Sequence, residues 1–269
     1  MDIMKNIYLL LATVFFIHSA PAAELFGTVD AVTGEVTVLT ANGESLRVSS
    51  GQKIFEGQTI QTSASGEVHI ASADSGLIAL RPNSNVRIDR FSAKGEPADE
   101  SVLTLFKGAM RAITGWVAKR NPSAYRIKTP TATIGVRGTD HETTVIETAT
   151  GDSLPGTYNT VQEGITVVQT AHGEIEVRPG QHIFASRDDN AAPRLLAQHP
   201  GFFLRRQLRI EERIQQRKEA MQQHVKNIME DRAEAVRENI GDRKPEIQKN
   251  REALKRRIQE HRARERTKP

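Results

Sequence analysis

The sequence predicts a mainly β body, either β-solenoid-like or a twisted β-sandwich, followed by a C-terminal α-helical hairpin or coiled coil. From Leu25 to about Ser186, short alternating runs such as GEVTVLT, GEVHIAS and EGITVVQT are separated by Gly, Asn, Asp, Ser and Pro. This alternation is typical of short strands joined by turns. A faint repeat aligns TANGESLRVSSGQKIF from Thr40 with TAHGEIEVRPGQHIF from Thr170, after one deletion. Similar strand and turn units at both ends suit a twisted or coiled sheet.

The C-terminal part, residues 202–269, follows a linker at 188–201 and has helical periodicity. Its apolar residues recur mostly three, four or seven positions apart: Leu208, Ile214, Met221, Val225, Ile228, Val236, Ile240, Ile247, Leu254 and Ile258. Gly241 suits the end of one helix and Pro245 the first turn of the next. Because the break shifts the phase of the apolar stripe, we expect two helices in an antiparallel hairpin or a kinked coiled coil.

Residues 1–23 read as an export signal. A lysine near the start, an apolar run from Ile7 to Ile17 and the small residues of HSAPAAE match a cleaved signal peptide. The run is shorter than the roughly 20 residues that span a bilayer. We therefore expect a periplasmic or secreted bacterial protein without a transmembrane segment in the mature chain.

Composition narrows the class of protein further. The chain has no cysteine, which excludes disulfide scaffolds, thiol enzymes and cysteine zinc sites. After Leu204 there are 20 Lys and Arg against 12 Asp and Glu, so the basic charge belongs to the tail. Its cations and acids alternate at helical spacing, which favours a solvated helix face over a nucleic-acid surface. Binding of the tail to an anionic envelope surface stays open.

The run TPTATIGVRGTDH, from Thr129 to His141, is the most distinctive stretch of the body. Pro130 fixes its own φ angle and biases Thr129 toward an extended conformation. Gly135 and Gly138 permit positive φ or a close approach of backbones. One arginine, Arg137, stands between Val136 and Gly138.

This run resembles the signature of the FecR family, named for the periplasmic sensor of ferric dicitrate transport. The matching residues are Thr129, Pro130, Ala132, Gly135, Val136, Arg137, Gly138 and Thr139. Upstream segments from Gly57 to Gly108, and a closing Gly180-Gln181, resemble the family's order of segments. The resemblance covers roughly Phe26 to Ala185, which makes residues 24–187 a FecR-like β domain.

The resemblance also limits what can be carried over. The best-known members join a cytoplasmic helical region that acts on a sigma factor, one membrane helix and this periplasmic domain. The sequence offers no residues for the first two parts. We therefore expect the exported, stand-alone form, whose ligand the sequence does not identify.

Arg137 has two possible roles. As a structural residue, its fork of donors would lie between layers and satisfy turn carbonyls or an acid such as Asp140 or Glu142. As a binding residue, it would receive a carboxylate or phosphate. We favour the structural role and keep ligand binding as a weaker candidate.

No pattern in the sequence indicates a cofactor, a metal or a catalytic residue. The histidines of the mature chain, from His69 to His261, are scattered, and none forms a pair at zinc-ligand spacing. Acidic pairs such as Asp188-Asp189 lie in predicted loops, and aromatic residues make up only 5% of the chain. The sequence therefore favours a non-enzymatic envelope module that binds a partner or ligand and associates with an envelope protein or itself through the tail. The alternative is a polysaccharide hydrolase or lyase on a β-solenoid.

Overall fold

The computed structural model describes the β body and scattered positions of the tail. The described residues are 23–149, 151, 153–187, 191–198, 200, 202, 215–216, 218–219, 222–223, 226–227, 230, 234, 237, 252–255 and 257. Position 202 and all described positions from 215 onward are helical. The expected signal peptide, apart from Ala23, and the expected helix break at 241–245 lie outside the described residues. Within the described part, no helix combines the length and hydropathy needed to cross a bilayer.

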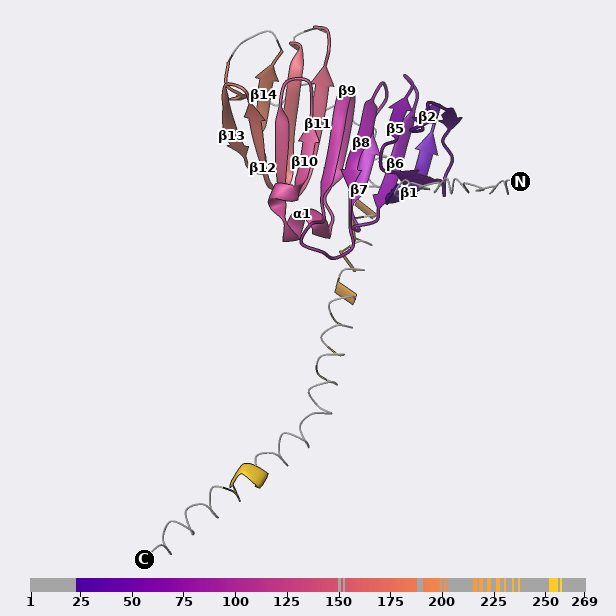
Figure 1. The fold of residues 1–269 in the computed structure, drawn as a ribbon. Helices are drawn as coiled ribbons and strands as arrows, with labels where there is room; N and C mark the ends of the chain where they lie inside the picture. The colour runs from indigo at the N-terminus through magenta and orange to yellow at the C-terminus, as the bar shows by residue number, and fades with distance from the viewer. Residues whose placement is uncertain are drawn as a thin grey trace, which may run out of the picture.

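The described body is a fifteen-stranded open sheet (Figure 1). In chain order the strands are β1 (Leu25–Thr33), β2 (Val36–Leu39), β3 (Ser45–Arg47), β4 (Lys53–Phe55), β5 (Thr59–Thr62), β6 (Glu67–Ser72), β7 (Leu77–Leu80), β8 (Asn85–Phe91), β9 (Ser101–Ile113), β10 (Tyr125–Lys128), β11 (Thr133–Ile146), β12 (Gly156–Thr170), β13 (Gly173–Val177), β14 (His182–Ser186) and β15 (Arg194–Leu195). A short helix, α1 (Trp116–Arg120), and a 3₁₀ turn, η1 (Pro122–Ala124), connect β9 to β10.

The sheet is folded into two layers. Layer A runs in the order β3, β2, β5, β8, first half of β9, β10, first half of β11, second half of β12, β13. Layer B runs in the order β4, β1, β6, β7, second half of β9, second half of β11, first half of β12, β14, β15. The long strands β9, β11 and β12 therefore belong to both layers.

Each long strand changes layer at a glycine with positive φ. These are Gly108 in β9 (φ 83°), Gly138 in β11 (φ 56°) and Gly164 in β12 (φ 77°). A Cβ on Gly164 would lie 2.2 Å from the carbonyl oxygen of Gly138, so the bends of β11 and β12 pack backbone against backbone. Only glycine has both the conformational freedom and the absence of a side chain that this corner requires.

The hydrophobic core lies between the layers. Inward residues such as Val38 and Ile60 of layer A, and Val68 and Ile70 of layer B, belong to one buried cluster and are at most 1% exposed. These β-branched side chains suit a pleated, buried surface. Alternation along each strand thus divides every layer into a core face and an outer face.

The internal repeat forms the two edges of the folded sheet. In the first copy Gly51 (φ 82°) follows edge strand β3 of layer A, and the chain enters edge strand β4 of layer B. In the second copy Gly180 (φ 78°) joins β13 to β14 in the same way. The following glutamine accepts a backbone N–H in both copies, from Ser49 to Gln52 at 3.1 Å and from Arg178 to Gln181 at 2.8 Å.

The mainly β prediction is confirmed, but the β-solenoid-like interpretation is wrong. Successive coils of a solenoid would pair in parallel, whereas β9 with β10 is the one parallel pairing among the described strands. All other pairings between described strands are antiparallel, and the sheet does not close. The body is therefore the twisted-sandwich alternative, made by folding one sheet over itself.

The corner at Gly164 should be more sensitive to substitution than a glycine at an edge turn. We expect Gly164→Ala to lower the free energy of unfolding by about 2–4 kcal/mol, from left-handed strain and the clash with Gly138. Gly51→Ala is the matched control, because Gly51 also has positive φ but a Cβ there would have no neighbour within 4 Å. Equal losses for the two variants in urea unfolding would mean that the packed corner does not matter.

Candidate functional site

The first half of the run TPTATIGVRGTDH forms the turn between β10 and β11. The backbone N–H of Thr129 donates to the carbonyl of Ala132 at 2.8 Å, and the Ala132 N–H donates back to the Thr129 hydroxyl at 2.9 Å. Pro130 lies inside this turn, where its missing N–H leaves no bond unmade. Thr157 of β12 donates to the Thr129 hydroxyl at 2.8 Å, which fixes the turn against layer B.

Arg137 does not occupy the buried place that we expected from the sequence. Ile134 and Val136 face the core, so alternation directs Gly135 and Arg137 to the outer face of layer A. Arg137 is exposed and makes no hydrogen bond or ion pair with any other described residue. The buried structural role that we expected for its guanidinium is therefore wrong. β11 crosses between the layers only at the next residue, Gly138, so Arg137 still belongs to the outer face of layer A.

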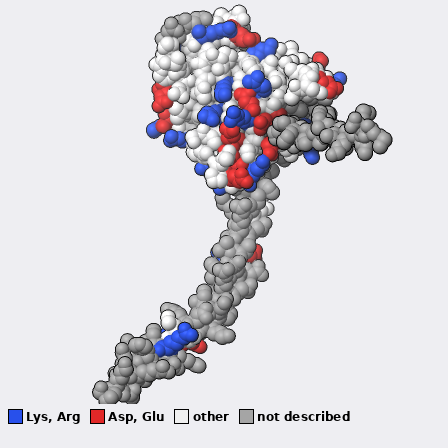
Figure 2. Space-filling view, viewed as in Figure 1, with Lys and Arg blue, Asp and Glu red and all other residues white. Residues whose placement is uncertain are grey.

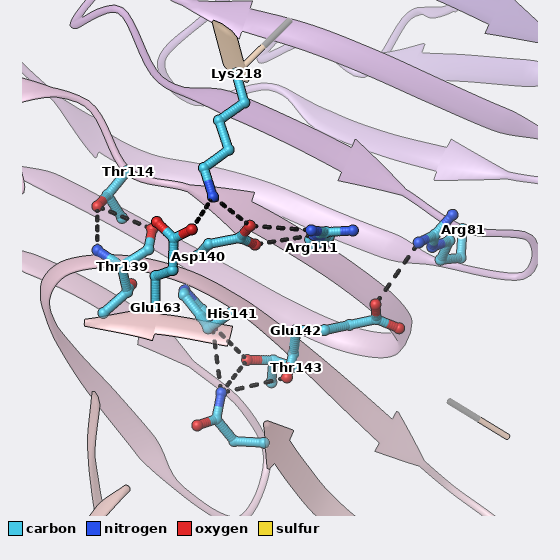
Figure 3. A network of polar contacts seen from close by, with 11 residues as sticks. Arg81, Arg111, Thr114, Thr139, Asp140, His141, Glu142, Thr143, Glu163 and Lys218 are labelled. Atoms are coloured by element: carbon cyan, nitrogen blue, oxygen red, sulfur yellow. Dashed lines mark hydrogen bonds and ion pairs between the residues drawn. The ribbon is translucent and has the colours of Figure 1, made fainter. Parts of the chain in front are cut away.

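Beyond the bend, the run continues into layer B and splits between its two faces. Asp140 and Glu142 point to the outer face of layer B, and His141 points into the core (Figure 3). Thr139 fixes this register, since its N–H donates to the Thr114 hydroxyl at 2.8 Å and its carbonyl accepts the Thr114 N–H at 2.9 Å.

A row of charged side chains crosses the outer face of layer B, and we call it the charge ladder; all are largely buried except Glu163, whose side chain is 62% exposed. It contains Glu67, His69, Arg81, Arg111, Asp140, Glu142, Glu163 and Lys218. Cross-strand pairing accounts for its order, because Ala79 of β7 lies between His69 and Arg111, and Arg111 is opposite Glu142. The ladder thus joins four strands of the body to the C-terminal tail.

Asp140 is the central acceptor of the ladder. Its two carboxylate oxygens receive Nε and Nη2 of Arg111 at 2.9 and 3.0 Å, a bidentate pair, and Nζ of Lys218 lies 3.4 Å from Oδ2. Burial alone would raise the pKa of Asp140, but the hydrogen bond and charge of Arg111 and the charge of Lys218 hold that pKa below its usual value. Asp140 is therefore ionised at neutral pH.

Lys218 comes from the tail and is itself buried, at 9% exposed. Besides Asp140, its ammonium donates to the Glu163 carboxylate. Lysine is almost never buried without a partner, because removing its charge from water is costly. Two carboxylates of the body provide that compensation here.

The other end of the ladder is held by Arg81. Its guanidinium lies 3.6 Å from Glu67 and 3.6 Å from Glu142, and Nε2 of His69 lies 2.9 Å from Glu67. Cations and anions therefore alternate along the face. Each charge of the ladder thus has a charge of opposite sign beside it, which buried charges need.

A second described residue of the tail region contacts the same layer. The ring of Phe202 meets Tyr158 edge to face at a centroid distance of 5.1 Å, and Tyr158 stacks against Phe184 at 4.7 Å. Tyr158 pairs with Thr144, two residues along β11 from Glu142, which places this contact beside the ladder. Phe202 and Lys218 thus provide one apolar and one ionic contact between the tail and layer B.

Beneath the ladder, His141 is fully buried in a small polar cluster. Nδ2 of Asn159 donates to Nδ1 of His141 at 3.3 Å, and the Thr166 hydroxyl of layer A donates to Oδ1 of Asn159 at 2.7 Å. Nε2 of His141 has no hydrogen-bond partner among the described residues. Burial lowers the pKa of His141 to about 4, so the imidazole is neutral at neutral pH.

Two carboxylates lie beside a tryptophan near α1, the arrangement that a sugar-cleaving enzyme needs. Glu96, Asp99 and Trp116 line a cavity of about 260 Å³ next to α1. Burial would raise the pKa of Asp99, but hydrogen bonds from the Lys94, Glu96 and Gly95 backbones and from Ser92 hold it below its usual value. A general acid needs the opposite shift. Asp99 therefore serves to hold the loop of residues 92–99 together through these hydrogen bonds.

Sequence reasoning named Asp140 and Glu142 only as possible partners of Arg137. In the structure Asp140 pairs with Arg111, from the stretch GAMRAITGW, and with Lys218, whereas Glu142 pairs with Arg81. Sequence reasoning singled out none of these three cations. The sequence signal that could have placed Asp140 on an outer face was the alternation of residues along the strand on either side of Gly138. No sequence pattern pairs it with a lysine 78 positions away. In the described part of the chain, no group of His, Asp and Glu is arranged to hold a metal.

Comparison with known proteins identifies the family of this region. Residues 58–176 match the family model of FecR protein, a stretch that includes the whole run and both acids that bind Lys218. The resemblance found in the sequence is thereby confirmed for this part of the chain. No curated protein matches the sequence.

Solved structures share less with the chain. Two crystal structures of a protein described as a candidate anti-sigma factor of Parabacteroides distasonis are 12% identical, with a TM-score of 0.39. The match covers 51% of this chain and 58% of that one, so it spans little more than half of the neighbour's length. A structure described as a cell surface anchoring domain is 33% identical over 24% of this chain and 84% of its own, with a TM-score of 0.23.

The buried imidazole predicts a loss of stability in mild acid. The folded-state pKa of about 4 lies below the ordinary 6.5, so the contribution of His141 is present above pH 6.5 and is lost as the pH falls toward 4. The full effect is about 3 kcal/mol. Urea unfolding from pH 7 to 4.5 should show this slope, and His141→Gln should flatten it. The exposed His172→Gln is the control, and an unchanged slope in His141→Gln would contradict the assignment.

The exposed position of Arg137 predicts a mild effect on stability. We expect Arg137→Lys to change the free energy of unfolding by less than about 0.5 kcal/mol, as at other solvent-exposed sites. Arg111→Lys, which breaks the bidentate pair with Asp140, should cost more than 1 kcal/mol. Thermal melts of the two variants decide between them, and a large loss in Arg137→Lys would restore the buried role.

Proposed function

We propose that the FecR domain of residues 58–176 is a non-enzymatic signalling module of the bacterial envelope, and that its charge ladder holds the C-terminal tail as a docked association arm. The observation that carries this proposal is the burial of Lys218 between Asp140 and Glu163. Asp140 belongs to the most distinctive run of the domain, and Lys218 to the helical tail. The contact therefore links the family's run to the part of the chain that we expect to bind proteins.

The chemistry of the contact suits a regulated interaction. A buried charge pair adds little net stability, but removing one partner is costly, so such pairs select a particular partner and register. Described tail positions beyond Glu219 are all exposed, including Leu254 at 58%. The arm is therefore held near its beginning and presents its later described residues to solvent.

The envelope location and the partner belong to the proposal. The expected signal peptide supports export, and the match to FecR protein supports a role in signalling. Asp140 and Glu142 of the ladder form ion pairs with its cations, and Asp99 is hydrogen-bonded within its own loop, which supports a non-enzymatic role over the enzyme alternative. The partner is an envelope protein or a second copy of the chain.

The docked arm can be tested in the full chain by hydrogen exchange. We expect Lys218→Gln to raise the exchange rate of backbone amides near residues 215–219 about tenfold or more, because Asp140 and Glu163 lose the cation that they were paired with. Lys226→Gln is the matched control, since Lys226 is exposed and lies 3.8 Å from Glu230 within the tail. Equal exchange in both variants would show that the arm is not held by the ladder.

The signalling role needs a second measurement. A photo-crosslinking residue at Leu254 should give protein adducts in envelope preparations, and the yield should change when Lys218→Gln frees the arm. Adducts that are the same in both chains would remove the regulatory part of the proposal. New reducing ends or unsaturated products from cell-wall or capsular glycans would instead identify an enzyme.

A further inference from the structure

The outer face of layer A is open, in contrast to the outer face of layer B. One row of cross-strand neighbours runs across the whole layer: Ser45, Leu39, Thr59, Arg87, Thr104, Lys128, Thr133, Gln169 and Glu174. Hydroxyl, amide and cationic groups dominate this row. Each can donate hydrogen bonds, and none of these residues is buried.

Three exposed cations stand beside one another on β10 and β11 of this face. Lys128 and Arg126 are two residues apart on β10, about 7 Å. Arg126 is paired with Gly135, which is two residues before Arg137 on β11. Arg137 is therefore one strand and two residues away from Arg126, about 8 Å. The arginine of the TPTATIGVRGTDH run thus belongs to a line of three cations.

The acids near the three cations are already paired, whereas Glu174 on edge strand β13 is exposed and has no ion pair with a described residue. Asp89 binds Arg87 at 2.5 Å, and Glu176 binds Arg178 at 2.9 Å. Glu100 lies 3.3 Å from Arg90 and 3.8 Å from Arg126. Among the described residues, Lys128 and Arg137 have no ion-pair partner. Figure 2 shows Lys and Arg over the middle of this face, with Asp and Glu among them.

Little side-chain bulk separates the cations of β10 and β11. Gly135 adds no side chain between Arg126 and Arg137, and its neighbour Val167 is half-buried. A strip with cations about 7–8 Å apart, and with hydroxyl or amide donors beside them, is complementary to an extended polymer that carries acidic groups and hydroxyls. A membrane surface would instead be met by protruding apolar side chains, and no large apolar side chain of the described strands β10 and β11 is exposed.

We propose that Lys128, Arg126 and Arg137 form a binding strip for an acidic polysaccharide. The cations bind carboxylates of the polymer, and Thr133 and Gln169 donate hydrogen bonds to its hydroxyls. This site lies on the opposite layer from the charge ladder, so it goes beyond the proposed signalling role. In this proposal the exposed Arg137 binds a carboxylate of the ligand.

The test uses the full chain and a linear polyuronate, polygalacturonate oligomers, as the probe. We expect binding at low salt that weakens as salt rises. The triple variant Arg126→Gln, Lys128→Gln and Arg137→Gln should bind about tenfold more weakly, since each exposed ion pair contributes a modest amount. The matched control removes three exposed cations from the tail, with Lys226→Gln, Arg237→Gln and Lys255→Gln, and should bind like the unaltered chain.

Each other result overturns the proposal. Loss of binding in the tail variant but not in the strip variant would place the anion site on the tail. Equal binding of fully methyl-esterified oligomers would show that acidic groups are not recognised. Binding to vesicles of 30% phosphatidylglycerol in phosphatidylcholine, without binding to the polyuronate, would assign the strip to membranes. Thermal melts confirm folding of both variants, because exposed substitutions change stability little, and no binding to either probe leaves the strip without a ligand.

Discussion

The bend of β11 at Gly138 decides which chemistry the domain presents on each face. Before the bend, alternation directs Val136 to the core and Arg137 to the outer face of layer A. After it, Asp140 faces the outer side of layer B and His141 the core. Because Gly164 packs directly on Gly138, the corner cannot shift without moving β12 as well. One backbone conformation therefore fixes the register of two charged surfaces.

The two surfaces differ in what satisfies them. On layer B, Asp140 forms ion pairs with Arg111 of the body and Lys218 of the tail, and both cations are largely excluded from water. On layer A, Arg137 stays hydrated and exposed. Desolvation makes the first surface selective for one geometry, whereas the second can exchange ligands at low cost. The domain thus holds its own tail on one side and leaves the other side accessible.

Much of the fold was predictable from the sequence, because strand alternation, turn residues and the repeat are local signals. The Gly-Gln turns at Gly51 and Gly180 form equivalent edges, as their sequence similarity suggested. The long strands were harder to predict, since a bend inside a strand looks like a turn between two strands. Arg137 was placed wrongly for this reason. The pairing of Asp140 with Lys218 depends on contacts between distant segments, for which a single sequence has no pattern.

The most direct test of the account is a double-mutant cycle between Asp140 and Lys218, measured by urea unfolding of the full chain. Asp140→Asn, Lys218→Gln and the double variant should give a coupling free energy of about 1–3 kcal/mol, as for other contacting charges with limited exposure. The exposed pair Lys226 and Glu230 should give at most about 0.5 kcal/mol in the same cycle. Additive effects of Asp140→Asn and Lys218→Gln, within about 0.3 kcal/mol, would contradict a tail fastened to the ladder.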